Sequence, residues 1–426
     1  MLPSTQKAAA IVAAGAIALT AACSGRKDKP VPDADNRADH AAAGVSASRD
    51  DGKTAKPVEA GGSAVFRSIS VGEQNFCGLT STGAVMCWGV NRSGLLSGDL
   101  EEGSEISEPS LVPGLDSGVG FVTTDTGHAC ALLGGGKLKC WGTNYLGQLG
   151  SGKEDGGTGL VQVAGLESGV SDVAVSGTHT CAVVSGGAVK CWGGTHRVRS
   201  KCGSDDCDYL PSVPAQIVGL ESGAKSVSIG TDFSCALMTS GAVKCWGSND
   251  SGELGDGSKK ERQTPEYVSG LESGITAISA GFDHVCALTS AGAVKCWGSG
   301  RMGAIGDGAF EHRLVPTQVV GLEAGVKAIA CGFHHSCAIM DTAVKCWGRN
   351  ASVGNFEPGL SVPEWRDSAV PLRVPGLESG VVAIGSGWHA CAITAAGVAQ
   401  CWGCELSASK DGDRCKTIAT RIPERR

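Results

Sequence analysis

The residues with the clearest chemistry in this sequence are cysteines that recur in pairs at a fixed spacing. Seven times, a cysteine stands nine or ten positions before the cysteine of a Cys-Trp-Gly triplet, as in residues 286–298, CALTSAGAVKCWG. Two thiols held opposite each other form a disulfide in an oxidising compartment, whereas cysteine pairs in reducing compartments commonly bind metal ions. Structural zinc sites use much shorter spacings. The spacing therefore favours disulfides and no metal site.

The residues between the paired cysteines predict the β-hairpin that positions them. With Cys286 opposite Cys296, alternation leaves a three-residue loop that ends in Gly292, and glycine is favoured at the last, left-handed position of such a loop. Directly opposed residues of an antiparallel pair bring their Cβ atoms close enough for a disulfide. The sixth copy is one residue shorter, so the same count gives it a two-residue loop, Asp341 and Thr342.

This reasoning assigns fourteen of the twenty cysteines to hairpins. The predicted hairpin disulfides are Cys77–Cys87, Cys130–Cys140, Cys181–Cys191, Cys235–Cys245, Cys286–Cys296, Cys337–Cys346 and Cys391–Cys401. Two further bridges are expected, Cys202–Cys207 in an insertion and Cys404–Cys415 in the C-terminal tail. Cys331 is left over and is expected to be a buried free thiol in an inner strand.

The other polar residues that recur with the repeat are interpreted as structural. A histidine stands two positions before the first cysteine in five copies (His128, His179, His284, His335 and His389), and we expect it to bond to backbone within its own repeat. An acid recurs in segments of the type GLESG (Asp116, Glu167, Glu221, Glu272, Glu323 and Glu378), which predicts a turn with a solvated carboxylate. The alternatives are metal or cation sites formed by several copies.

Two glycine-rich segments resemble nucleotide-binding loops. GSGRMG (298–303) has the spacing of a dinucleotide fingerprint but opens no helix, and GQLGSGK (147–153) has Glu154 where a phosphate-binding loop needs Ser or Thr. The repeat itself explains the glycines in both. With no nucleophile elbow and no acid pair outside the repeat, we predict no cofactor, no catalytic residues and no enzyme.

The elements that carry these residues repeat with them. The seven CWG tryptophans follow one another at intervals of 50 to 55 residues, a period typical of stacked supersecondary units. One unit contains four strand signals, ITAISA (275–280), HVCALT (284–289), AVKCWG (293–298) and PTQVVG (316–321), and no helical periodicity. Four strands repeated seven times predict an all-β fold, a seven-bladed β-propeller of four-stranded antiparallel blades.

The segments WGTNYLGQLGSG (141–152), WGSNDSGELGDG (246–257) and GFHHSCAI (332–339) resemble the regulator of chromosome condensation repeat over about residues 64–426. The resemblance implies a seven-bladed propeller. The founding member is a nuclear guanine nucleotide exchange factor, an activity that fold alone does not transfer. Secreted bacterial members, among them a β-lactamase inhibitor, look like protein-binding modules.

The N-terminus predicts export. Residues 1–22 combine Lys7 with an apolar run too short for a membrane span, which is typical of a signal peptide, and small residues before Cys23 resemble the lipobox of bacterial lipoproteins. The alternative is an ordinary cleaved signal with an incidental cysteine. Residues 23–63 are expected to be the lipidated Cys23 and a disordered linker, and 64–426 the propeller. The net charge of −7 argues against a nucleic-acid partner.

Strand order divides the loops between two faces. One face carries the turns before each first cysteine and the loops after each CWG, and it is named here the long-loop face. The opposite face carries the hairpin loops and the GLESG turns, and it is named the hairpin face. The long-loop face varies between copies and carries candidate binding aromatics, namely Tyr145, Tyr209, Phe310, Phe356, Trp365 and Trp388. We predict a monomeric, extracytoplasmic, non-catalytic lipoprotein, anchored to the membrane through its lipid, that binds a protein or surface polymer. The alternatives are a carbohydrate-active hydrolase or lyase of the cell envelope and a purely structural envelope component.

Overall fold

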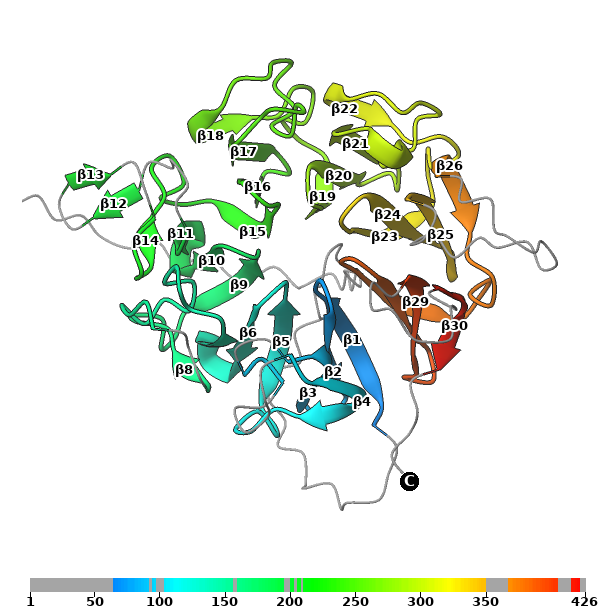
Figure 1. Cartoon of the computed structure of the whole chain (residues 1–426). Helices are drawn as coiled ribbons and strands as arrows, with labels where there is room; N and C mark the ends of the chain where they lie inside the picture. The colour runs from blue at the N-terminus through cyan, green and yellow to red at the C-terminus, as the bar shows by residue number, and fades with distance from the viewer. Residues whose placement is uncertain are drawn as a thin grey trace, which may run out of the picture. The chain divides into compact units, whose positions relative to one another are not determined.

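The strands that the structure describes form seven four-stranded sheets and one inserted two-stranded hairpin. The computed structural model describes residues 64–91, 94–96, 103–155, 159–194, 200–202, 205–207, 210–349, 367–404 and 415–421, and for 201–202, 205–207, 404 and 415–421 it describes backbone alone. Every four-stranded sheet is antiparallel and its strands follow chain order, so each of these sheets is one sequence repeat. Figure 1 shows the sheets as blades around a central axis, with the first strand of each blade innermost. The predicted seven-bladed β-propeller is confirmed.

The blades are numbered here in chain order. Blade 1 is β1 (Phe66–Val71), β2 (Asn75–Thr80), β3 (Val85–Val90) and β4 (Glu105–Leu111). Blade 2 is β5 (Val119–Thr124), β6 (His128–Leu133), β7 (Lys137–Gly142) and β8 (Val161–Gln162). Blade 3 is β9 (Val170–Val175), β10 (Thr180–Val184), β11 (Ala188–Trp192) and β14 (Ala215–Gln216), with the inserted hairpin β12 (Ser200–Cys202) and β13 (Asp205–Cys207). Blade 4 is β15 (Ala224–Ile229), β16 (Phe233–Met238), β17 (Val243–Gly247) and β18 (Arg262–Tyr267).

The remaining blades repeat this order. Blade 5 is β19 (Ile275–Ala280), β20 (His284–Thr289), β21 (Val294–Gly298) and β22 (Arg313–Gln318). Blade 6 is β23 (Val326–Cys331), β24 (His335–Met340), β25 (Ala343–Gly348) and β26 (Ser368–Arg373). Blade 7 is β27 (Val381–Ser386), β28 (Ala390–Thr394), β29 (Ala399–Cys404) and β30 (Cys415–Arg421). Three single turns of 3-10 helix are η1 (Gly134–Gly136), η2 (Ser185–Gly187) and η3 (Arg301–Gly303), and no described helix is long and apolar enough to cross a membrane.

The hairpins have the predicted register and carry the seven predicted disulfides. Cys286 lies opposite Cys296, and the Thr289 N–H donates to the carbonyl of Ala293 at 2.9 Å, which leaves the three-residue loop. Gly292 closes that loop with φ +78°. The Cα atoms of all seven bridged pairs are 4.0–4.2 Å apart. In blade 6, Met340 pairs with Ala343, so the two-residue loop is also confirmed.

The outer strand of blade 5 begins earlier than its sequence pattern predicts. The expected segment was 316–321, whereas β22 covers 313–318. Gly298 pairs with Arg313 beyond a bulge, which extends the strand towards its N-terminus. The carbonyl of Val319 accepts a hydrogen bond of 3.3 Å from the Leu322 N–H, so the chain already turns where the pattern predicted strand.

The hydrophobic core lies between blades. The side of blade 5 that carries Cys286 and Leu288 packs against the side of blade 6 that carries Trp347, and all three side chains are buried. Blade 4 packs its disulfide in the same way against Trp297 of blade 5. Because both sides of each blade are buried against neighbouring blades, the inner strands carry apolar residues on both of their faces. The first and last blades close the propeller through a 2.9 Å hydrogen bond from the Phe66 N–H to the Gly397 carbonyl.

Candidate functional site

The propeller axis opens on the long-loop face into a cavity of about 340 Å³. Every blade contributes the end of its inner strand and the turn that follows, the turn that precedes the first cysteine of each pair. The lining therefore combines copies of one repeat position, and any difference between blades at that position makes the cavity asymmetric.

Backbone hydrogen bonds between blades hold these turns together. The Phe282 N–H donates to the Gly332 carbonyl at 3.2 Å, and the Phe333 N–H donates to the Gly387 carbonyl at 2.8 Å. The Trp388 N–H donates to the Gly72 carbonyl at 3.1 Å across the junction of blades 7 and 1. Buried backbone groups are satisfied in this way, so the turns form a connected rim rather than independent loops.

This close approach requires glycine in the turns. A Cβ on Gly281 would lie 2.3 Å from the Gly332 carbonyl oxygen, and a Cβ on Gly332 would lie 2.3 Å from that of Gly387. No side chain fits at such distances. Glycine stands five residues before the first cysteine in four blades (Gly72, Gly230, Gly281 and Gly332), and serine stands there in two others (Ser176 and Ser386). In blade 2 the residue at this position is Asp125, which breaks the symmetry.

The cavity has an aromatic wall formed by Phe282, Phe333 and Trp388 of blades 5, 6 and 7. The ring centroids of Phe282 and Phe333 are 4.2 Å apart, and those of Phe333 and Trp388 are 4.6 Å apart. Phe282 is 39% exposed although it is a large apolar residue. Contiguous exposed aromatic surface marks recognition sites on soluble proteins.

An acidic wall formed by Glu73 and Asp125 lies on blades 1 and 2. Burial, together with the negative charge of Glu73, raises the pKa of Asp125 to about 6, although backbone hydrogen bonds at Thr126 and Gly177 act in the opposite direction. A carboxyl group with a raised pKa in a cavity is typical of functional sites. Asp172 is the third carboxylate of the lining, and it accepts a 2.8 Å hydrogen bond from the Val227 N–H.

Four of the histidines before the cysteine pairs contact a hydroxyl group of the next blade, so the expected backbone bond within the repeat is wrong for His128, His179, His284 and His335. His284 Nε2 lies 2.8 Å from the Ser336 hydroxyl of the next blade, and His335 Nε2 lies 2.6 Å from that of Ser386. Ser336 donates to the Ala304 carbonyl at 3.1 Å, so it accepts from His284 and places the proton of that imidazole on Nε2. Burial lowers the pKa of His284 to about 4 and that of His335 to about 3. These imidazoles are therefore neutral structural links.

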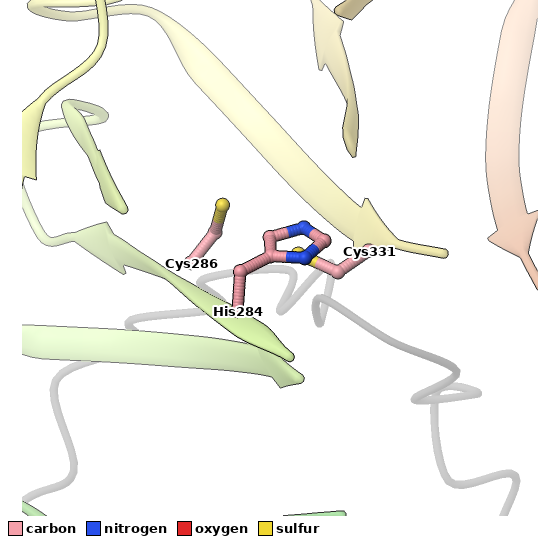
Figure 2. Close-up of side chains that lie close together, drawn as sticks. All are labelled: His284, Cys286 and Cys331. Atoms are coloured by element: carbon pink, nitrogen blue, oxygen red, sulfur yellow. The ribbon is translucent and has the colours of Figure 1, made fainter. Parts of the chain in front are cut away.

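A compact sulfur and nitrogen cluster lies between blades 5 and 6. Figure 2 shows His284, Cys286 and Cys331 close together, and one ligand atom of each lies within 4.8 Å of the others. Cys286 is bonded to Cys296, so its sulfur is not a metal ligand while that bridge is intact. Cys331 is a buried free thiol in the inner strand β23, as predicted, and burial raises its pKa to about 11.

Comparison with known proteins identifies the repeat. Residues 66–95, 224–253 and 275–304, and also 240–288 and 291–339, match the regulator of chromosome condensation (RCC1) repeat. The chain is 30% identical over 314 residues to the RCC1 domain-containing protein RUG3, mitochondrial, of Arabidopsis thaliana, across 70% of this chain and 68% of RUG3. The chain belongs to the RCC1 repeat family.

Two further RCC1-type proteins show how widely the resemblance extends. The ultraviolet-B receptor UVR8 of Arabidopsis thaliana is 26% identical over 317 residues, across 71% of this chain and 70% of UVR8. The crystal structure of Prp20p from Saccharomyces cerevisiae, described with its binding properties to Gsp1p and histones, superposes with a TM-score of 0.66 at 20% identity. That superposition covers 85% of this chain and 88% of Prp20p and concerns the fold alone.

The candidate binding aromatics occupy different parts of this RCC1-type propeller. Tyr145 and Phe310 lie in long loops and are 67% and 56% exposed. Trp388 lies in the aromatic wall, which also includes two residues that sequence reasoning missed, Phe282 and Phe333. The remaining three, Tyr209, Phe356 and Trp365, lie outside the described residues, as does Cys23.

The GLESG turns of the RCC1 repeats behave as predicted where their side-chain contacts are described. The carboxylate of Glu221 accepts a 2.9 Å hydrogen bond from the Gly219 N–H of its own turn, and Glu323 does the same with Gly321. The backbone of β12 and β13 pairs Cys202 with Asp205, and that of β29 and β30 pairs Cys404 with Cys415. The bridges Cys202–Cys207 and Cys404–Cys415 stay predictions.

Proposed function

We propose that this protein is a non-catalytic binding scaffold that recognises a protein or surface polymer through its long-loop face. The observation that carries the proposal is the asymmetric axial cavity, with its exposed aromatic wall, on a face that also presents Tyr145 and Phe310. Rigid aromatic anchors on a preorganised surface are typical of binding sites. A receptor, UVR8, and a protein that binds Gsp1p and histones, Prp20p, share the fold and support a protein partner.

In this function the protein would lie outside the cytoplasm, anchored to a membrane. Seven disulfides indicate an oxidising compartment. Residues 1–22 would act as a signal peptide, with Cys23 lipidated, residues 24–63 as the tether and the propeller as a monomer. Mass spectrometry of the N-terminal peptide tests the anchor: we expect diacylglycerol on Cys23, and an unmodified cysteine 23 on the exported chain would contradict it.

Site-specific photo-crosslinking on intact source cells tests the binding face. A photoreactive residue at Tyr145 or Phe310 should give adducts with the same partner, whereas positions Ser240 and Ser290 on the hairpin face should give none. Tyr145→Ala should then weaken binding of the purified partner. Adducts confined to the hairpin face would refute the proposal.

A second candidate function, a carbohydrate-active hydrolase or lyase of the cell envelope, is favoured by one observation. Glu73 and Asp125 place two carboxyl groups in one cavity, and the raised pKa of Asp125 is what a general acid requires. Incubation with purified cell-wall polysaccharide distinguishes the two functions. Release of new sugar ends that Asp125→Asn abolishes would establish the enzyme, and the absence of any release would support the binding scaffold.

A further inference from the structure

Four donor atoms converge at the cluster between blades 5 and 6. One ring nitrogen of His284 and the sulfurs of Cys286 and Cys331 all lie within 4.8 Å of one another (Figure 2). The hydroxyl of Ser336 lies 2.8 Å from His284 Nε2. The same hydroxyl is 3.6 Å from the sulfur of Cys286 and 3.7 Å from that of Cys331. All four side chains are buried, and imidazole nitrogen with sulfur is the donor set that zinc prefers.

The separations between these donors are close to those of a metal site. In a tetrahedral zinc site with bonds of about 2.0 Å to nitrogen and about 2.3 Å to sulfur, neighbouring ligand atoms are about 3.5 to 3.8 Å apart. The Ser336 hydroxyl already lies near this distance from both sulfurs. Because the sulfurs are within 4.8 Å of each other, the hydroxyl lies beside them and not between them. Closing the donors around an ion therefore needs shifts of about 1 Å or less.

The free thiol of this cluster is peculiar to one blade. Cys331 stands six residues before the first cysteine of its blade, where the other blades have Val71, Thr124, Val175, Ile229, Ala280 and Gly385. At the boundary of blades 4 and 5, Ala280 takes the place of Cys331 and Phe233 takes the place of His284. The packing of the repeat therefore does not require a thiol or an imidazole at these positions.

The second ring nitrogen of His284 supports a metal ligand at the first. Nδ1 is buried and has no hydrogen-bond partner within the described part of the chain, while Nε2 donates to Ser336. Oδ1 of Asp283 lies 4.0 Å from this Nδ1. An ion bound at Nε2 would transfer the proton to Nδ1, next to the carboxylate, and histidine ligands of metals typically donate their other N–H to such a group. Metal binding would thus give a buried polar atom its partner.

We propose that the boundary of blades 5 and 6 is a redox-controlled zinc site, in which Cys286, Cys331 and Nε2 of His284 bind Zn²⁺ once the Cys286–Cys296 bridge is reduced. A thiol reductant supplies the electrons: two of its thiols become a disulfide, and Cys286 and Cys296 become thiols. Zn²⁺ then replaces the thiol protons of Cys286 and Cys331, and two protons pass to solvent. The Ser336 hydroxyl takes the fourth position and keeps its bond to the Ala304 carbonyl.

This site differs from the one that the sequence argues against. The cysteine spacing excludes zinc within a single hairpin, whereas these ligands come from two neighbouring blades. In the oxidised protein Cys286 is held by Cys296, and the cluster is ordinary packing between blades. Reduction of one bridge exchanges a covalent link within blade 5 for a metal link between blades 5 and 6.

A single substitution opens the site without any reductant. Cys296→Ala frees the sulfur of Cys286. Cys245→Ala is the matched control, because it frees Cys235 at the same position of blade 4, where the next blade offers Ala280. Co²⁺ serves as the spectroscopic probe for Zn²⁺. Cys296→Ala should bind one Co²⁺ per chain with thiolate-to-cobalt charge-transfer bands, which Zn²⁺ abolishes, whereas Cys245→Ala should show no such bands.

Further substitutions in the Cys296→Ala protein identify the ligands. Cys331→Ser should weaken Zn²⁺ binding about 100-fold or more and reduce the charge-transfer intensity, since loss of a ligand costs at least as much as loss of an outer partner. Asp283→Asn should weaken binding about tenfold and leave the Co²⁺ spectrum unchanged, because this residue acts through His284. Charge-transfer bands missing from a folded Cys296→Ala protein, or bands that Cys331→Ser leaves unaltered, would overturn the proposal. Circular dichroism shows whether each variant is folded.

The wild type tests the redox control, and it decides the question if Cys296→Ala does not fold. The oxidised chain is equilibrated in glutathione redox buffers with fixed free Zn²⁺ or with a chelator, and alkylation followed by peptide mass spectrometry counts the thiols. An ion that binds only the reduced form favours that form. Zn²⁺ should therefore raise the ratio of reduced to oxidised Cys286–Cys296 about tenfold or more and leave Cys235–Cys245 unchanged. A ratio that Zn²⁺ does not alter would refute the site.

Discussion

Trp347 Nε1 donates a 2.9 Å hydrogen bond to the carbonyl oxygen of Ala304, in the long loop of the preceding blade. The Ser336 hydroxyl donates to the same oxygen at 3.1 Å. Trp192 and Thr180 of blade 3 repeat this pair of bonds at the carbonyl of Gln148 in blade 2, three blade boundaries earlier. Trp192 and Trp347 therefore each tie the long loop of one blade to the core of the next.

Trp347→Phe should lower the free energy of unfolding by about 2 kcal/mol, because it removes the indole N–H and leaves a small cavity between blades 5 and 6. Chemical denaturation of the oxidised protein measures the change. Trp388→Phe is the matched control, since that side chain is only partly buried in the cavity wall, and its effect should be much smaller. Equal losses in the two variants would contradict a special role for the Trp347 bond.

The hairpin disulfides should contribute stability individually. Replacing both Cys286 and Cys296 with alanine removes a bridge that closes a short loop, with a sequence separation of 10, and should lower the free energy of unfolding by about 3 kcal/mol. The double variant avoids a new free thiol. Denaturation of the variant beside the wild type gives the difference, and an unchanged midpoint would show that the bridge adds nothing to the packing around it.

The local structure of each blade was predictable because covalent and short-range constraints specify it. The cysteine spacing and Gly292 specify the hairpin register. The hairpin of blade 6 is one residue shorter, which specifies the two-residue loop in which Asp341 takes φ +59°. Contacts between blades were not predictable in the same way. His335 and Ser386 are 51 residues apart in the chain, and no local pattern shows that they meet.

The asymmetry of the candidate site did leave a signal in the sequence. Aligning the repeats on their first cysteines places Asp125 in a column that is otherwise glycine or serine. A search for catalytic motifs does not detect Asp125, because a single acidic residue forms no motif. Phe282 and Phe333 stand in the adjacent column, and their contact follows only from the arrangement of the inner strands around the axis.

Acidification should destabilise the protein through its buried histidines. Burial lowers the pKa of His335 from its ordinary value of 6.5 to about 3. As the pH falls, His335 therefore binds a proton near pH 6.5 in the unfolded chain but only near pH 3 in the folded protein. The stability that the neutral imidazole contributes is therefore lost progressively as the pH falls between these values. Between pH 7 and pH 5, the free energy of unfolding should fall by about 2 kcal/mol less in His335→Gln than in the wild type. Denaturation at both pH values tests this, and an unchanged pH dependence would contradict it.

Asp125 should have the opposite pH dependence. Its pKa is raised to about 6 in the folded protein from an ordinary value of 3.8, so folding favours its protonated form and the folded state loses stability as the pH rises from about 4 to about 6. Burial is the main cause of the raised pKa of Asp125, the negative charge of Glu73 adds to it, and backbone hydrogen bonds at Thr126 and Gly177 oppose it. Asp125→Asn should therefore raise the free energy of unfolding at pH 7 by up to about 3 kcal/mol and change it little at pH 4.

Denaturation of Asp125→Asn and of the control Glu266→Gln at pH 4 and pH 7 measures this difference. A gain in stability at pH 7 would show that the carboxylate is retained at the expense of folding, as is common at functional sites. Destabilisation at both pH values would instead mean that Asp125 serves the fold through its backbone hydrogen bonds.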